Sequence, residues 1–507
     1  MTFWTPESIR AAVAGTWLAR TPASDRARPE GVAIDSRTIR PGQVFLALKG
    51  DRFDGHAFVP AAIAAGASML IVERADALPS SLPEGAAALR VPDSRKALLR
   101  LAAAYRASLA ATKVIAVGGS NGKTTTTRLI HAILSTRLRG TCSAKSFNND
   151  VGVPLTILSA RESDQYLICE VGSNAPGEIA LLAAVVRPDI AVITSIGREH
   201  LERLGSLEGV AREEAAMLPE VRPGGAAIIP ADAPLLLDHA RAAAAAGLHV
   251  VTFGRAAEAN LRLTAFEHVA SDPAPSDPTP DAIRFQVNAR QSFQAPMVGE
   301  HNALNALAAI AVARRLGLSD AEIARGLAGV VVPDMRLQRT LVAGIHVVND
   351  AYNANPDSTL AALRAFAAIN AAAPRRVVVL GDNLELGDAG PDAHREIGRA
   401  ILALAGGRVI DLLVAVGPLA AIAADAVEAA AHAATGPRVV RFPDLDDGRD
   451  RAAAALLRPG DCVLLKGSRR VALERVVAAL RASPEVQARV AAARHPAPAS
   501  GATGDAP

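Results

Sequence analysis

Cysteine and lysine are scarce in this 507-residue chain, and both shortages limit what it can do. Its three cysteines, Cys142, Cys169 and Cys462, lie far apart. They form neither a zinc-ligand spacing nor a disulfide framework, so we expect a reducing compartment. Only six of the 54 basic residues are lysines, and none lies between Lys145 and Lys466. A lysine at a candidate site is therefore informative, because its compact ammonium differs from the planar guanidinium that the chain otherwise uses.

Other features are missing as well. The formal net charge is only +3, so the charge balance does not require a nucleic-acid partner. The opening "MTFWTPESIRAAVAG" has no charged region followed by an apolar signal core, and it predicts a helix capped by Thr5 with Pro6 at its first position. The most apolar later stretch, residues 409–424, contains Asp411 and a Gly-Pro turn, so it cannot cross a bilayer. We expect a cytoplasmic monomer that is not inserted in a membrane.

The order of the predicted elements indicates α/β architecture in more than one domain. Apolar residues make up 50% of the chain and charged residues 21%, and the length exceeds that of one ordinary core. Short β-branched runs alternate with alanine-rich helical stretches, first as "KVIAVGG", "YLICEVG", "IAVITSI", "AAIIP" and "HVVTF". After Met335 they continue as "IHVVND", "RVVVLGD", "DLLVAVG", "RVVRF" and "CVLLKG". Two doubly wound sheets in series explain this better than one sheet, with a third unit before residue 110.

The stretch "VIAVGGSNGKTTTTRLI", residues 114–130, predicts a phosphate-binding turn between a strand and a helix. Such a turn directs backbone N–H groups and the positive end of the helix dipole at one point. Gly119 and Gly122 let the chain curl close to an anion, Lys123 can reach terminal phosphates, and the Thr124 hydroxyl can ligate Mg²⁺. The strict P-loop pattern requires glycine where Val117 stands. The plain alternative is a glycine turn with an exposed lysine, and the scarcity of lysine argues against it.

The residues of this predicted turn also resemble a known protein family. "GGSNGKTT" resembles the phosphate loop of the Mur ligase family, which joins amino acids or dipeptides to peptidoglycan precursors, although the family usually has threonine at the position of Gly118. "DSRTIRPGQVFLALKGDRFDGHAFVPAAIAAGA" resembles its UDP-holding N-terminal domain, "FNNDVGVPLTIL" a segment that faces the muramoyl-peptide, and "GEHNALNALAA" the nucleotide-base segment. "NDAYNANPDS", "VVLGDNLELG" and "LLKGSR" resemble the branch that adds D-alanyl-D-alanine to UDP-N-acetylmuramoyl-tripeptide. The Asp-Asn-Pro-Arg motif of the diaminopimelate-adding branch is absent.

The resemblance implies three α/β domains and a disordered tail. We predict a small mixed N-terminal domain over 1–110, a central P-loop-type doubly wound parallel sheet over 111–333, and a Rossmann-like C-terminal domain over 334–482. Residues 483–507 form the predicted tail, and the Pro/Ser/Asp-rich stretch 270–282 is predicted as a surface loop. We also predict that the C-terminal domain closes by rotation about a hinge near residues 332–335.

The resemblance further implies an ATP-dependent amide ligase with magnesium as its metal. In the family, ATP converts a substrate carboxylate into an acyl phosphate, which an incoming amine then attacks. Two alternatives remain open at this point. One is another amino-acid ligase of the superfamily, such as a folylpolyglutamate synthase or a different Mur branch. The other is a nucleotide-binding protein whose catalytic site has decayed.

The metal ligands implied by the resemblance include one departure from the family pattern. Glu170 ends the apolar strand "YLICEVG", and His200 follows the next strand. The family then has a lysine that reacts with CO₂ to form a carbamate, but here Glu214 stands at that position. Either Glu214 supplies the carboxylate directly or it is a solvated helix glutamate, and Glu213 takes its place if the register differs by one. The predicted metal ligands are Thr124, Glu170, His200 and Glu214.

The remaining site predictions also follow from the resemblance. The catalytic residues are predicted to be Lys123, Glu170, His200, Glu214 and Arg336. The predicted ATP-binding residues are Gly119, Ser120, Asn121, Gly122, Lys123, Thr124, Thr125, His301, Asn302, Arg336 and Asp350. The residues predicted to bind the peptide and UDP substrates are Ser36, Arg37, Asp54, His56, Asn148, Asn149, Thr156, Tyr352, Asn353, Asn355 and Lys466. His301 and Asn302 could equally cap the helix that they begin.

Overall fold

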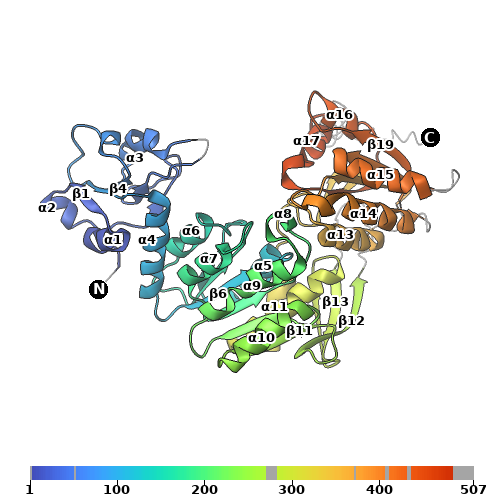
Figure 1. The fold of residues 1–507 in the computed structure, drawn as a ribbon, viewed down its shortest axis with the longest axis horizontal. Coiled ribbons are helices and arrows are strands. Elements are labelled where there is room, and N and C mark those ends of the chain that lie inside the picture. Colours follow the sequence, from blue (N-terminus) through green and yellow to red (C-terminus); the bar gives the residue numbers. More distant parts are fainter. Residues whose placement is uncertain are drawn as a thin grey trace, which may run out of the picture.

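The computed structural model describes residues 3–50, 53–269, 282–369, 373–405, 410–430 and 436–483. They form three sheets, each in its own body of the molecule, and the predicted three-domain α/β fold class is confirmed (Figure 1). The central body lies between the other two, and helix α8 (Leu201–Leu204) lies where it meets the C-terminal body. Within the described part of the chain, no helix combines the length and apolarity that a membrane span requires.

The N-terminal body contains a mixed five-stranded sheet in the order β1-β5-β4-β3-β2. Its first helix begins at Pro6, and the Thr5 side chain accepts the Ser8 N–H at 3.1 Å, as predicted. Helix α4 packs against α1 on one side and against α6 and α7 of the central body on the other, so it joins the two bodies. The elements are α1 Pro6–Val13, β1 Thr16–Ala19, α2 Pro22–Asp25, β2 Val32–Ala33, β3 Val44–Leu46, η1 Gly55–Phe58, α3 Val59–Ala64, β4 Met69–Val72, η2 Ala75–Ala77, β5 Ala87–Arg90 and α4 Ser94–Ser108.

The central body contains a nine-stranded sheet in the order β14-β13-β12-β11-β10-β9-β6-β8-β7. The strands from β7 to β12 pair in parallel, and β13 and β14 extend the edge in antiparallel fashion. Along β6, Val114 and Ala116 pack in one core and Ile115 and Val117 in the other, so helices cover both faces. That alternation is what a doubly wound sheet requires.

The strands of this body are β6 Lys113–Gly118, β7 Gly140–Cys142, β8 Tyr166–Glu170, β9 Ile190–Ile193, β10 Ala226–Pro230, β11 His249–Gly254, β12 Leu261–Val269, β13 Ala282–Val287 and β14 Gln291–Ala295. Its other helices are α5 Lys123–Leu134, α6 Gly152–Ser159, α7 Glu178–Val186, α9 Leu207–Ala215, η3 Leu218–Glu220, α10 Pro234–Ala245, α11 Glu300–Arg315 and α12 Asp320–Ala328. The predicted loop 270–282 lies outside the described residues except for Ala282, which begins β13.

The C-terminal body contains a six-stranded sheet in the order β15-β16-β20-β17-β18-β19, parallel except for the β15–β16 pair. All five predicted strands form. Its elements are β15 Gln338–Val342, β16 Ile345–Asp350, α13 Pro356–Ala368, β17 Arg375–Gly381, η4 Gly387–Ala389, α14 Gly390–Ala405, β18 Leu412–Val416, α15 Pro418–Ala430, β19 Arg438–Phe442, α16 Arg449–Ala454, β20 Asp461–Lys466, η5 Arg469–Val471 and α17 Glu474–Ala482. Of the predicted tail, residues 484–507 lie outside the described residues.

Candidate active site

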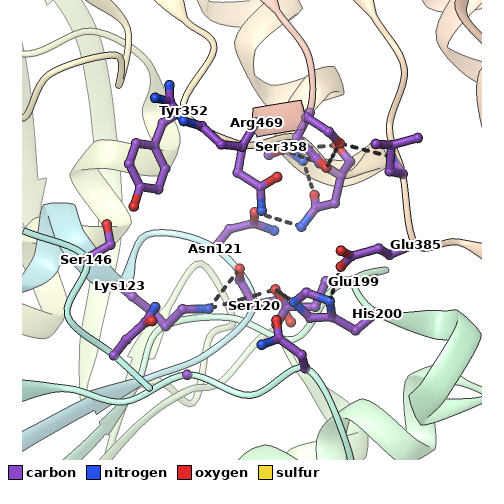
Figure 2. A pocket seen from close by; sticks show the side chains of 18 of the residues that line it. Ser120, Asn121, Lys123, Ser146, Glu199, His200, Tyr352, Ser358, Glu385 and Arg469 are labelled. Carbon is purple, nitrogen blue, oxygen red and sulfur yellow. Dashed lines mark hydrogen bonds and ion pairs between the residues drawn. The ribbon is translucent and has the colours of Figure 1, made fainter. Parts of the chain in front are cut away.

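A polar cavity of about 340 Å³ lies between the central and C-terminal bodies. Its walls are the segments that follow β6, β7, β8 and β9 on one side, and on the other the segments that follow β16, β17 and β20 together with Arg336. The carboxyl ends of parallel strands are the usual place for a ligand in α/β sheets. Figure 2 shows Lys123, Glu199 and His200 on the central wall, facing Tyr352 and Arg469 across the cavity. The predicted residues that line it are Ser120, Asn121, Gly122, Lys123, Asn148, Asn149, Glu170, His200, Arg336, Tyr352, Asn353, Asn355 and Lys466.

The phosphate loop connects β6 to α5 and is tightly held by its surroundings. Gly119 and Gly122 have φ values of 110° and 88°, in the left-handed region that favours glycine. A Cβ on Gly122 would lie 2.3 Å from Asn305 Oδ1. The N–H groups of Ser120 and Asn121 donate to the carbonyl oxygen and Oγ of Ser195, each at 2.9 Å. Helix α5 then begins at Lys123, so its first-turn N–H groups, which have no acceptor within the helix, are available to an anion.

The Lys123 ammonium rests against the loop that carries it. Its Nζ donates to the carbonyl oxygens of Gly119 and Ser120, and it lies 3.8 Å from Glu199 Oε2. The Lys123 side chain is only 14% exposed. This arrangement places a positive charge at the cavity wall, where terminal phosphates would be neutralised.

Glu170 and its neighbours fit a magnesium ion. Glu170 is 1% exposed; its Oε1 accepts from Asn148 Nδ2 at 3.1 Å, while Oε2 is buried without a hydrogen-bond partner among the described residues. Burial raises the pKa of Glu170, against the opposing effects of Arg336 and Lys123. Thr124 does not line the cavity, but its hydroxyl lies 3.1 Å from Oγ of Ser146, which does. Carboxylate and hydroxyl oxygens are the hard donors that Mg²⁺ prefers, and an unpartnered buried oxygen suits a cation.

The predicted metal ligands are nevertheless not gathered into one cluster. Within the described ranges, no three His, Cys, Asp or Glu side chains come together as a ready metal site. Glu170 and His200 line the cavity, whereas Glu214 does not. A magnesium ion here would complete its coordination with water and phosphate oxygens, as it usually does in phosphoryl-transfer sites.

His200 is engaged by the C-terminal body. Its Nδ1 lies 2.6 Å from Glu385 Oε2, and its Nε2 lies 3.9 Å from Glu199 Oε2. Burial lowers the pKa of His200, although Glu385 opposes that effect. Burial raises the pKa of Glu199, and Lys123 opposes the effect. The sequence prediction missed Glu199, although three charged residues in a row after an apolar strand, Arg198 to His200, were a signal of it.

Glu214 and Glu213 each hold backbone N–H groups. Glu214 is 3% exposed, and its Oε2 accepts the Gly119 N–H at 2.7 Å. Glu213 accepts the N–H groups of Gly177 and Ile179, each at 2.8 Å, at the start of α7. Neither side chain is solvated on the helix surface, and Glu213 is a helix-capping residue. A metal-ligand role for Glu214 stays a prediction.

The C-terminal wall contains an ion pair that the sequence did not indicate. Lys466 lies 2.7 Å from Asp350 Oδ2 and donates to the carbonyl oxygen of Asn353 at 3.0 Å. Asp350 also accepts the Leu337 N–H, so its carboxylate is engaged by protein groups and does not line the cavity. Arg336 lies 4.4 Å from the centre of the Tyr352 ring and 3.4 Å from Thr124 Oγ1.

Several predicted site residues lie away from the cavity and take part in local structure. Thr156 is buried and donates to the Gly152 carbonyl at 2.9 Å, and Asn302 donates to the Val298 carbonyl at 2.7 Å. His56 is buried between Asp54, 2.5 Å from its Nδ1, and the Glu73 N–H that its Nε2 accepts at 2.8 Å. Burial lowers the pKa of His301 to about 4. Ser36, Arg37, Asp54, His56, Gly119, Thr124, Thr125, Thr156, Glu214, His301, Asn302 and Asp350 do not line the cavity.

Polar contacts join the two walls. The Arg198 guanidinium binds Asp357 Oδ1 at 2.7 Å and Glu396 Oε2 at 2.6 Å, and Asn355 Nδ2 donates to Asn121 Oδ1 at 2.9 Å. The sequence prediction did not single out Arg198 or its partners. It also missed charged residues that line the cavity, among them Glu199, Glu385, Arg469 and Arg470, although Glu385 and Arg469 stand inside quoted motifs. The Ser146 hydroxyl was missed as well.

Comparisons of the sequence and of the structure with known proteins both match this chain to one family. Residues 29–106 match the model of the Mur ligase family catalytic domain, 117–313 the Mur ligase middle domain, and 335–469 the Mur ligase glutamate ligase domain. The UDP-N-acetylmuramoyl-tripeptide–D-alanyl-D-alanine ligase of Bacillus subtilis is 36% identical over 95% of this chain and 99% of its own length. The Escherichia coli ligase of the same name is 33% identical over 89% of this chain and 94% of its own length. The crystal structure of MurF from Acinetobacter baumannii superposes with a TM-score of 0.79, at 32% identity, over 95% of this chain and 99% of its own. The chain therefore belongs to the Mur ligase family.

Proposed function

We propose that this chain is an ATP-dependent ligase that joins D-alanyl-D-alanine to UDP-N-acetylmuramoyl-tripeptide during the synthesis of peptidoglycan precursors. The observation that carries the proposal is the cavity in which a phosphate loop faces the strand ends of a second α/β sheet. Relatives matched along nearly their whole length bear these two substrates in their names. Together these findings favour this reaction over a folylpolyglutamate synthase or a different Mur branch.

The reaction requires two transfers at one place. The terminal phosphoryl group of ATP moves to the substrate carboxylate, which gives an acyl phosphate and ADP. The dipeptide's amine then attacks the acyl carbon, an amide bond forms, and phosphate leaves. Lys123 and the first turn of α5 would grip the phosphates, and Arg336 would approach them from the opposite wall. Such sites accelerate the reaction mainly by positioning and by neutralising charge.

Glu170 and Thr124 are the residues that would hold magnesium, and His200 lines the same cavity. When bound, the ion neutralises charge on the phosphate oxygens during transfer. We place the UDP end of the substrate on residues 1–110, ATP on 111–333 and the dipeptide on 334–482. Tyr352, Asn353, Asn355 and Lys466, on the C-terminal wall, are the proposed dipeptide contacts.

Phosphate release from the purified protein tests the proposal. With ATP, Mg²⁺, UDP-muramoyl-tripeptide and D-alanyl-D-alanine, we expect turnover that stops when the dipeptide is omitted and is unchanged by added bicarbonate. Lys123→Ala should abolish it, while Lys113→Ala, at a lysine that is 59% exposed, should not. Turnover with glutamate in place of the dipeptide would contradict the assigned substrate. No turnover in any combination, with nucleotide still bound, would favour a decayed ligase.

A further inference from the structure

Two positions at which this chain departs from the family pattern touch each other. Gly118 ends β6, and Glu214 lies near the end of α9. A Cβ built on Gly118 would lie 2.7 Å from Glu214 Oε2 and 2.6 Å from Met217 Cε. These separations are shorter than van der Waals contact. A side chain at position 118 and the Glu214 carboxylate in its present place therefore exclude each other.

We propose that Glu214 is a positioning residue for the phosphate loop, and that the missing side chain at Gly118 gives its carboxylate access to the loop backbone. The inference rests on the proposed function, because the loop acts by gripping nucleotide phosphates. It assigns Glu214 a role that acts through Gly119, whose N–H it accepts at 2.7 Å.

Gly119 is held from both sides. Its N–H donates to Glu214, and its carbonyl oxygen accepts from the Lys123 ammonium. Lys123 must leave that carbonyl when it moves to a phosphate, whereas Glu214 does not depend on the ligand. With φ at 110°, Gly119 occupies a backbone region that needs support from its surroundings. Glu214 thus keeps the loop curved at the moment when Lys123 releases it, and the first turn of α5 stays aimed at the cavity.

The neighbouring residue shows that α9 uses buried glutamates in this way. Glu213 is 7% exposed and accepts two N–H groups at the start of α7, away from the phosphate loop. The two side chains have the same chemistry, the same helix and similar burial, but they hold different segments. Glu213 is therefore a matched control for Glu214.

The first test measures the affinity for a non-hydrolysable ATP analogue with Mg²⁺ by calorimetry, with thermal unfolding measured on the same samples. Glu214→Ala should raise the Kd about tenfold or more, because it leaves the buried Gly119 N–H without its acceptor. Glu214→Gln should stay within about threefold of the wild type, because its amide oxygen can accept the same N–H. Glu213→Ala should lower the unfolding temperature and leave the Kd unchanged.

The second test uses Gly118. The φ of Gly118 is not in the left-handed region, and the two atoms that lie too close to a new Cβ are the ends of the flexible Glu214 and Met217 side chains. Gly118→Ala should therefore change the unfolding temperature little but raise the Kd as Glu214→Ala does. The double variant should bind no more weakly than either single one, because both changes remove the same contact.

The outcomes separate this inference from the function on which it rests. A wild-type Kd in Glu214→Ala would overturn the positioning role while leaving the ligase proposal intact. Equal losses in Glu214→Gln and Glu214→Ala, with a higher Mg²⁺ requirement, would overturn it in favour of a metal ligand. No binding of the analogue by the wild type would remove the proposed function, and this inference with it.

Discussion

At the residue scale, Glu170 combines burial with an oxygen that no described group satisfies. An ionised carboxylate in that position costs stability unless a cation binds it. Natural sites commonly retain such destabilising groups because the reaction needs them. The Glu170 side chain is therefore the clearest single mark of a functional site on the central wall.

Glu170→Gln should separate activity from stability. The amide oxygen can still accept from Asn148, and the buried charge is gone, so the unfolding temperature without Mg²⁺ should stay equal or rise. Turnover should fall at least about 100-fold, because charge stabilisation by a metal ion is worth several kcal/mol. Phosphate release and thermal unfolding measure the two effects. Glu73→Gln, at a carboxylate bonded to Ser94, is the control that should turn over normally. Near-normal turnover of Glu170→Gln would contradict the metal assignment.

The sequence predicted the positions of site residues at strand ends more accurately than those of residues whose hydrogen-bond partners depend on the tertiary structure. Glu170 ends one predicted strand and His200 follows the next, and both line the cavity. Thr156 and His56 were selected from matching segments, but short-range hydrogen bonds engage both of them. Glu385 lies about 185 residues from His200 along the chain, and only tertiary structure brings them within 2.6 Å. No local pattern encodes such a pair.

At the scale of elements, the apolar runs predicted β6 and β8 to β11 of the central sheet, but not the short parallel strand β7 or the antiparallel edge. Strands β12 to β14 are partly exposed and contain charged and polar residues such as Glu267, Arg284 and Gln294, which face solvent. A half-exposed edge strand therefore lacks the continuous apolar run that marks a buried parallel strand. The strands beside the phosphate loop are buried on both faces, which is why the sequence indicated them.

Helix α14 holds the segment that follows β17 by means of a buried neutral histidine. His394 Nε2 accepts the Asn383 N–H at 3.0 Å, and its Nδ1 lies 2.7 Å from the Gly390 carbonyl oxygen. Burial lowers the pKa of His394, against smaller opposing effects of the Gly390 carbonyl and Asp382. Below the ordinary pKa of 6.5 the unfolded chain then binds more protons than the folded one. The stability that this histidine contributes is present above pH 6.5 and is lost as the pH falls.

Acidification from pH 7.5 to 5.5 should therefore lower the unfolding temperature of the wild type by more than that of His394→Gln, with a difference of a few degrees. Scanning calorimetry at both pH values gives the comparison. His346→Gln changes an exposed histidine on β16 and should keep the pH dependence of the wild type. The same loss in wild type and His394→Gln would show that His394 does not titrate as burial implies.

At the scale of the whole molecule, the central body meets its two neighbours through different chemistry. One continuous apolar core includes Ile9 and Leu98 of the N-terminal body together with Leu167 of the central body. Asn121, Arg198 and His200 make polar contacts with the C-terminal body, although Val298 also packs in the apolar core of that body. Met335 and Leu337 in the connecting segment have φ values of 57° and 52°. Apolar junctions are rigid, whereas polar ones resemble transient interfaces that open. The predicted motion near residues 332–335 therefore belongs to the C-terminal body.

Arg198 should control that motion, because its side chain forms ion pairs with Asp357 and Glu396 of the C-terminal body. The preceding residue, Gly197, donates its N–H to Ser120 Oγ in the phosphate loop, so Arg198 connects that loop to the C-terminal body. The Arg198 side chain is 26% exposed, so screening weakens each ion pair, but its guanidinium binds both acids at once. Arg198→Ala should lower kcat/KM at least about tenfold, a loss of about 1.4 kcal/mol of transition-state stabilisation, with little change in unfolding temperature.

Solution scattering on the same variant separates closure from chemistry. Without nucleotide, Arg198→Ala should have a larger radius of gyration than the wild type, and bound ATP analogue should compact both. Arg212→Ala removes an equal charge from an exposed position on α9 and should behave like the wild type in both measurements. If Arg198→Ala loses activity but scatters like the wild type, Arg198 acts within the site and does not join the bodies. If it keeps full activity, the contacts with Asn355 and Glu385 are sufficient to bring the two walls together.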